Sequence, residues 1–168
     1  METGGPLPYT DTKDVGAADF YLAVNSTFRF IERKRGLEGL REYWTGLGAR
    51  YFAPVTKTWQ QGGLKQVARY WRAFFAAEPG AEVEVIEDEN SVTLEVKVCP
   101  AIALLREQRR EIVPCFCQHC YFVNEAMARP AGLTARVEGG NGSCRQVFLR
   151  REAADAGQDL TRIKEAAC

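Results

Sequence analysis

The spacing of apolar residues changes near residue 80 of this chain, and that change limits the folds available to it. Before this point, apolar side chains recur every three or four residues, which is the pattern of amphipathic helices. Three breaks interrupt the pattern, at Gly36, at Pro54 and at the pair Gly62-Gly63. We therefore expect a helix from residue 20 to about Gly36, a second that ends at Pro54, and a third from Gly63 to Pro79. The aromatic residues of these helices are expected to fill the core.

Beyond residue 80, apolar residues alternate with polar ones, as they do in strands that bury one face. Residues 83–85 and 92–98 both alternate, and Asp88-Glu89-Asn90 lies between them. Two alternating runs joined by a short polar segment are typical of a β-hairpin. We therefore expect an antiparallel hairpin over residues 83–98 with one apolar face.

A second hairpin is expected over residues 133–149. Its two runs flank Gly139-Gly140-Asn141-Gly142, and glycine and asparagine are the residues that tight hairpin turns favour. Because successive side chains of a strand point to opposite faces, Cys144 shares its face with Gln146 and Phe148. Arg145 points to the other face.

Helices are expected in the rest of the chain, a short one from Pro100 through Arg110, a cysteine-bearing one from Pro114 to about Pro130, and a terminal one over residues 153–168. The order is helices, hairpin, two helices, hairpin, helix. Segregated helices and hairpins favour an α+β domain, with an antiparallel sheet of two hairpins packed against helices. Residues 17–168 form this single domain, and residues 1–16 read as a flexible leader.

The charges of the chain exclude some classes of function. Lysine plus arginine equal aspartate plus glutamate (22 − 22 = 0), so nothing points to nucleic acid or to an anionic membrane surface. Residues 1–15 lack the apolar core of a signal peptide, and no apolar run approaches the ~18 residues that span a bilayer. We therefore expect a cytoplasmic protein whose cysteines are thiols or metal ligands rather than a disulfide framework.

Three of the six cysteines and the only histidine lie within six residues, Cys115-Phe116-Cys117-Gln118-His119-Cys120. Pro114 precedes them, and proline suits the first position of a helix. At helical spacing, Cys120 lies in the middle of the face that should be buried, with Cys117 and Asn124 along its edge. Cys115 and His119 share a different side. The cluster is therefore expected to form the first turns of a helix.

Two kinds of chemistry fit this cluster. Cys117 and Cys120 lie one helical turn apart, and Cys144 or Cys99 could complete a thiolate site for a metal such as zinc. Alternatively, one thiol acts as a nucleophile. A thiol at a helix N-terminus has a lowered pKa, a condition that Cys99 and Cys115 both meet, and His119 could serve as the base.

Ordinary packing explains some of these features equally well. Buried cysteine often behaves as a small apolar residue, and a single histidine on a helix is more often a surface or capping residue than a catalyst. The run Arg106 to Arg110 is most simply a solvated helix face, and residues 139–142 a turn. Three thiols and an imidazole within six residues exceed what a core requires, and for the cluster as a whole we favour a function.

Part of the sequence resembles a known family. The residues that carry the resemblance are Val98-Cys99-Pro100, then Cys117, Cys120 and Asn124, then Gly139-Gly140-Asn141-Gly142-Ser143-Cys144-Arg145-Gln146-Val147-Phe148. This arrangement is similar to the 2-amino-thiazoline-4-carboxylic acid hydrolase family. A more distant similarity runs to the four-vinyl-reductase ligand-binding domains and their transport-particle relatives, many of which hold zinc. This chain lacks their extra acid and cysteine just upstream of Cys144.

The resemblance implies a hydrolase that opens a small cyclic amidine or thiazoline-type substrate in a cysteine-rich pocket. Cys117 or Cys120 would be the nucleophile or a metal ligand, faced by Cys144, with His119 as the proton carrier. Asn124 would orient the substrate. Arg145 could pair with a substrate carboxylate, although its side of the strand is the wrong one. Cys99 and Cys115 are also expected to contact the substrate.

Two other classes of function stay open. One is a sensor that binds a small molecule or zinc, through Cys117, Cys120 and Cys144, without catalysis. The other is an enzyme of a natural-product pathway that acts on a different cysteine-derived substrate. The expected partner in each case is a small molecule, and an exposed apolar face on the first helices would make a homodimer natural.

Overall fold

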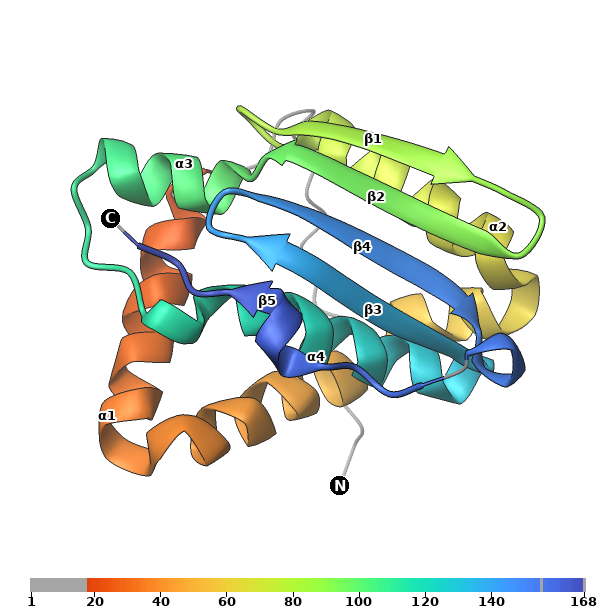
Figure 1. The fold of residues 1–168 in the computed structure, drawn as a ribbon, viewed down its shortest axis with the longest axis horizontal. Helices are drawn as coiled ribbons and strands as arrows, with labels where there is room; N and C mark the ends of the chain where they lie inside the picture. The colour runs from red at the N-terminus through yellow and green to blue at the C-terminus, as the bar shows by residue number, and fades with distance from the viewer. Residues whose placement is uncertain (1–17, 155, 168) are drawn as a thin grey trace, which may run out of the picture.

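The computed structural model describes residues 18–154 and 156–167, so the expected leader at residues 1–16 lies outside the described part. Four helices and five strands make up the main elements of that part (Figure 1). In chain order they are α1 (Phe20–Gly46), α2 (Ala53–Ala77), β1 (Glu82–Glu87), β2 (Ser91–Val98), α3 (Pro100–Glu107), α4 (Gln118–Ala128), β3 (Leu133–Gly140), β4 (Ser143–Arg150) and β5 (Ile163–Lys164).

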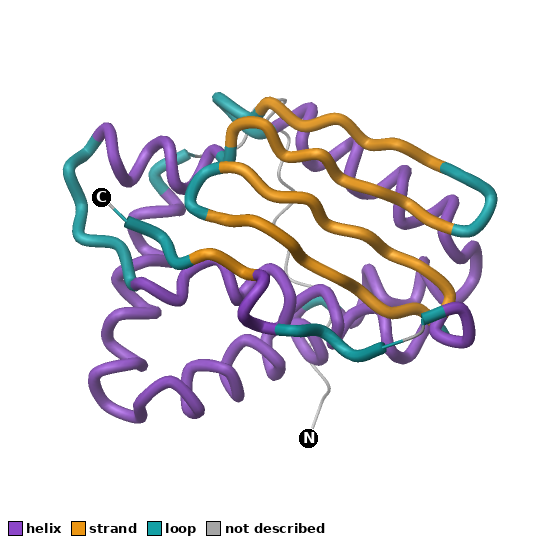
Figure 2. Tube along the Cα trace, in the orientation of Figure 1, coloured by secondary structure: helices purple, strands orange, loops and turns teal. Residues whose placement is uncertain are grey.

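The strands form one open sheet in the order β1-β2-β4-β3-β5. Both hairpins are antiparallel, and they join through β2 and β4, which are also antiparallel; the short β5 runs parallel to β3. Figures 1 and 2 show α1, α2 and α4 on one face of this sheet and α3 at its end. The predicted α+β class, with its two hairpins packed against helices, is confirmed.

The core lies between the sheet and these helices. Register pairs Val92 with Phe148 and Leu94 with Gln146, so these side chains share the covered face of the sheet. Trp44 of α1 and Trp59 of α2 are fully buried in the same core. The prediction that the aromatic rings of the first helices pack inside is therefore confirmed for Trp44 and Trp59, whereas Phe20 and Phe30 are exposed.

Two glycines bend the long helices where the sequence predicted breaks. Gly36 in α1 has φ 68° and Gly63 in α2 has φ 56°, values that favour glycine over residues with a Cβ. The second predicted helix ends as a π-helical turn at Tyr51, close to Pro54 as predicted, and Pro54 itself lies in the first turn of α2. That position needs no backbone N–H, so proline is tolerated there.

The predicted terminal helix is wrong. Residues 151–154 and 156–167 instead contain two short 3₁₀ turns and β5, and β5 runs along the open edge of β3. The side chain of Gln158 exchanges two hydrogen bonds with the backbone of Val137, and the N–H of Ala166 donates to the carbonyl of Pro114. A free strand edge offers unpaired backbone groups, and this segment satisfies several of them.

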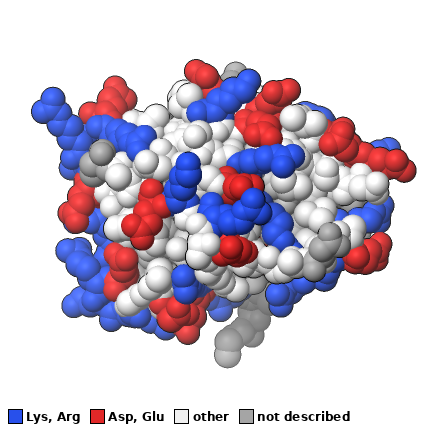
Figure 3. Space-filling view, viewed as in Figure 1, with Lys and Arg blue, Asp and Glu red and all other residues white. Residues whose placement is uncertain are grey.

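The uncovered face of the sheet carries charges of both signs (Figure 3). Ion pairs such as Arg145–Glu95 and Arg162–Glu138, with nitrogen–oxygen distances of 2.8 and 2.6 Å, account for much of this pattern. Such exposed pairs contribute little to stability. No helix within residues 18–154 and 156–167 is long and apolar enough to cross a membrane.

Candidate functional site

Four thiols gather where the start of α4 meets the inner face of β4. Cys117 ends the 3₁₀ turn that precedes α4, and Cys120 lies in the first turn of α4. Cys144 lies on β4, and Cys99 directly follows β2. Cys120 is close enough to Cys99, Cys117 and Cys144 for its charge to raise the pKa of each. We call these four residues the thiol cluster, and each of them lies within electrostatic reach of the other three.

Burial keeps the thiol cluster neutral. It raises the pKa of Cys99 to about 11 and that of Cys117 and Cys120 to about 12, and it raises that of Cys144 further. Backbone N–H groups at the start of α3 lower the pKa of Cys99, as expected for a helix N-terminus, but burial has the larger effect. The predicted low pKa values of Cys99 and Cys115 are therefore wrong, since burial raises that of Cys115 to about 12 as well.

His119 lies among aromatic rings beside the cluster. Its ring centroid is 5.0 Å from that of Phe116 and 5.5 Å from that of Phe28, and burial lowers its pKa below 6.5. Its Nδ1 is 2.6 Å from the carbonyl oxygen of Phe116. A carbonyl only accepts, so Nδ1 carries the proton and Nε2 is left as an acceptor.

The sulfur of Cys120 contacts this imidazole from the side. It lies 3.9 Å from Nδ1 and 3.8 Å from Nε2, so it is nearly equidistant from the two nitrogens. A thiol placed in line with the Nε2 lone pair would be much nearer to Nε2 than to Nδ1. Proton transfer from Cys120 to His119 therefore requires a rotation of the Cys120 side chain.

Two buried amides connect α4 to β4 within the cluster. Asn124 donates from Nδ2 to Oε1 of Gln146 at 2.9 Å, and Gln146 donates from Nε2 to the sulfur of Cys144 at 3.4 Å. A hydrogen bond with Gln146 also lowers the pKa of Cys120, against the effect of burial. Asn124 therefore orients Gln146, and Gln146 holds two of the four thiols. The sequence analysis did not select Gln146, although a polar residue on the apolar side of a strand was a usable signal.

The β3–β4 turn and the C-terminal segment close the cluster at Cys117. The backbone N–H of Asn141 donates to the sulfur of Cys117 at 3.3 Å. A Cβ on Gly140 would lie 3.3 Å from that sulfur and 2.6 Å from the carbonyl oxygen of Lys164. A side chain therefore has no room here, which explains the glycine.

Arg106 of α3 is the arginine that adjoins the thiol cluster. It donates from Nε to the carbonyl of Ala167 at 3.0 Å and from Nη2 to Oδ1 of Asn141 at 2.5 Å. Its charge lowers the pKa of Cys99 and Cys117. Arg106 is exposed, as the sequence predicted for this helix face, and its contacts with the turn and the C-terminal segment bring it beside the cluster.

Two predicted site residues lie elsewhere. Arg145 projects from the uncovered face of the sheet and pairs with Glu95, because odd-numbered residues of β4 point away from the helices. Cys115 is buried on the other side of the helix start, where its thiol donates to Oε1 of Glu32 at 3.7 Å. The structure therefore offers no support for either residue in a site with Cys120.

No metal site is evident. Within the described ranges, no group of three or more histidine, cysteine, aspartate and glutamate side chains is arranged to hold a metal ion. The structure therefore lends no support to zinc at Cys117, Cys120 and Cys144.

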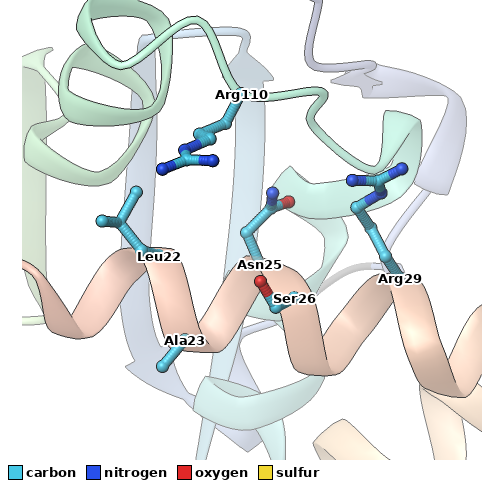
Figure 4. Close-up of a pocket in the computed structure, with 6 residues that line it drawn as sticks. All are labelled: Leu22, Ala23, Asn25, Ser26, Arg29 and Arg110. Carbon is cyan, nitrogen blue, oxygen red and sulfur yellow. The ribbon is translucent and has the colours of Figure 1, made fainter.

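Two hollows lie away from the thiols. One of about 290 Å³ lies over α1, lined by Asn25, Ser26, Arg29 and Arg110 among others (Figure 4). The side chain of Asn25 there is already hydrogen-bonded to the backbone of Glu111 and Val113. The second, of about 430 Å³, lies over the uncovered face of β3 and β4. Its arginines are engaged by neighbouring carboxylates and carbonyl groups.

Comparison of the chain with protein-family models, with curated proteins and with solved structures finds no match. The family resemblance read from the sequence therefore stays a prediction.

Proposed function

We propose that this chain is a hydrolase that opens a small cyclic amidine or thiazoline-type ring at the thiol cluster, with Cys120 as the nucleophile. The observation that carries the proposal is the contact of Cys120 with an imidazole, within electrostatic reach of three other thiols. Two amides complete the surroundings. A thiol next to an oriented base is the arrangement that nucleophilic catalysis uses.

The reaction would proceed in two steps. The sulfur of Cys120 bonds to the amidine carbon while its proton passes to Nε2 of His119, and the proton then goes to the ring heteroatom as that atom leaves. Water adds to the same carbon, the bond to Cys120 breaks, and the thiol regains a proton. A 2-amino-thiazoline opened in this way yields a carbamoyl product with a free thiol.

Arg106 would take the role that the sequence assigned to Arg145. Its guanidinium lies beside Cys99 and Cys117, and guanidinium groups bind carboxylates through paired hydrogen bonds. A ring carboxylate of the substrate would bind there, while the amidine carbon approaches Cys120.

A second candidate is a binding or sensor domain without catalysis, as in the distant relatives that the sequence suggests. It is favoured by the neutral state of the half-buried thiols and by the contact of the Cys120 sulfur with both ring nitrogens of His119 at nearly equal distance. In that case, the same residues would bind a small molecule and leave it unchanged.

Single substitutions test the two candidates. Cys117, Cys120 and Cys144 are replaced by serine one at a time, and the opening of 2-amino-thiazoline-4-carboxylate is followed through the thiol that it releases. Cys115→Ser is the matched control, because it removes a buried thiol outside the cluster. We expect Cys120→Ser to abolish turnover and Cys115→Ser to retain it. Equal turnover by the wild type and Cys120→Ser would exclude the thiol mechanism, and no turnover by the wild type would favour the binding domain.

A further inference from the structure

A tyrosine and a glutamate from two different helices form a close pair beside the thiol cluster. The hydroxyl of Tyr21 in α1 donates to Oε2 of Glu78, the residue after α2, at 2.5 Å. Both side chains are half-buried. Among the ion pairs of residues 18–154 and 156–167, none involves Glu78. A partly buried carboxylate without a cation is unusual, because burying an unpaired charge costs free energy.

Glu78 continues an aromatic stripe of α2. Trp71 and Phe75 precede it by seven and three positions, which places all three on one side of the helix. The rings of Trp71 and Phe75 are stacked, with centroids 5.5 Å apart and 23° between their planes. Nε1 of Trp71 is buried and has no hydrogen-bond partner among the residues that the structure describes. The stripe therefore combines aromatic faces, a carboxylate and an unused N–H donor.

This stripe lies on the same side of the sheet as the thiols. The ring of Trp71 contacts that of Phe148, with centroids 6.2 Å apart, and Phe148 shares its strand face with Gln146 and Cys144. The hydroxyl of Tyr21 is close enough to Cys99 and Cys120 to be influenced by their charges. Tyr21 therefore connects Glu78 with the side of the core on which the thiol cluster lies.

Aromatic faces next to a carboxylate are what a planar organic cation requires. The rings attract the positive charge, and the carboxylate accepts paired hydrogen bonds from two N–H groups. A carboxylate oxygen has two lone pairs, so Oε2 can accept from Tyr21 and from a ligand at once. An amidinium group has this planar shape, its charge and its two parallel N–H groups.

We propose that Glu78, held by Tyr21 and flanked by Trp71 and Phe75, binds the amidinium group of the substrate. This inference rests on the proposed function, because it names the recognition element for a ring opened at Cys120. Glu78 and Tyr21 are binding residues in this scheme, and neither takes part in bond making. The cation bound at Glu78 would also lie near Cys120 and would favour its thiolate form.

Binding of acetamidine and of 2-amino-thiazoline, measured by calorimetry on the full chain, tests this site. Glu78→Gln keeps the shape of the side chain and removes its charge. Glu84→Gln is the matched control, since Glu84 is an exposed carboxylate on β1. We expect Glu78→Gln to weaken binding by about 10- to 100-fold, the range for a charged hydrogen bond. We expect Glu84→Gln and Cys120→Ser to bind as the wild type does.

Several outcomes overturn the inference. Unchanged affinity in Glu78→Gln excludes the site, as does a wild-type protein that binds neither amidine. If Glu78→Gln fails to fold, Tyr21→Phe decides: it removes only the hydroxyl, and unchanged affinity in it overturns the proposal. Failure of the proposed function is distinguishable, because Cys120→Ser would then bind amidines normally while the wild type opens no ring. Ring opening with a wild-type KM in Glu78→Gln would leave the function intact and exclude this site.

Discussion

The reactivity of Cys120 toward an alkylating agent is the most direct measure of its surroundings. Burial raises its pKa from an ordinary value of 9.0 to about 12. Only the thiolate reacts with iodoacetamide, and at pH 8 a rise of this size lowers the thiolate fraction by about 1,000-fold. We therefore expect Cys120 in the folded chain to be alkylated about 1,000 times more slowly than the same residue in urea.

The pH dependence separates this effect from simple steric protection. If the pKa is about 12, the alkylation rate of Cys120 rises about tenfold for each pH unit and continues to rise above pH 9. A shielded thiol with an ordinary pKa would react slowly as well, but its rate would level off near pH 9. Peptide mapping by mass spectrometry gives the rate for each cysteine separately, and the chain unfolded in urea is the control.

Cys115 provides an internal comparison. Its pKa is also about 12, raised by burial and by the carboxylate of Glu32, so it should be equally slow although it lies outside the thiol cluster. A plateau for Cys120 near pH 9, or a native rate within about tenfold of the unfolded one, would refute the reasoning from burial. Either result would also make Cys120 a nucleophile that needs no bound substrate.

Three further predictions concern stability. Glu125→Ala should lower the free energy of unfolding by about 2–4 kcal/mol in urea denaturation, because it removes a buried carboxylate that pairs with Arg151 at 2.6 Å and leaves its other donors unpaired. Gly140→Ala should lower it by about 1–3 kcal/mol, since its Cβ would lie 2.6 Å from the carbonyl oxygen of Lys164; a melting temperature equal to that of the wild type would contradict this. Burial lowers the pKa of His119, so the unfolded chain binds a proton that the folded chain does not, and stability should fall as the pH drops below about 6.5. Denaturation at pH 5 and pH 7 measures the effect, which His119→Gln should remove.

The hairpins could be predicted from the sequence because strand patterns depend on local alternation. Val92, Leu94 and Val96 of β2 and Gln146 and Phe148 of β4 are buried at every second position, and a shift by one residue would expose these side chains. The terminal helix could not be rejected in this way. Its conformation depends on backbone partners on β3, far away in the sequence, and they outweigh a weak helical pattern with two apolar anchors.

The candidate site shows more clearly that local sequence patterns do not reveal contacts between distant residues. The side of β4 that carries Cys144, and the outward direction of Arg145, follow from strand parity alone. The direction in which the thiol pKa values shift does not follow from the sequence. At Cys99 the helix N-terminus lowers the pKa, but burial raises it by more. Tyr21 and Glu78 are 57 residues apart, and no spacing in the sequence indicates that they meet.

The thiol cluster has the proximity of groups that nucleophilic catalysis needs, but its thiols are protonated unless a bound ligand lowers their pKa. The sulfurs of the cluster are gathered together, as a nucleophilic site requires, yet their partial burial also keeps them protonated. A cation brought into the region would favour the thiolate, since an opposite charge nearby stabilises the ionised form. Glu78 forms no ion pair with another described residue, and its partner Tyr21 lies within electrostatic reach of Cys99 and Cys120, so the group that Glu78 would bind is also the group that would activate them. On this view the empty site is unreactive, and selectivity for a cationic substrate and activation of the nucleophile have one physical cause.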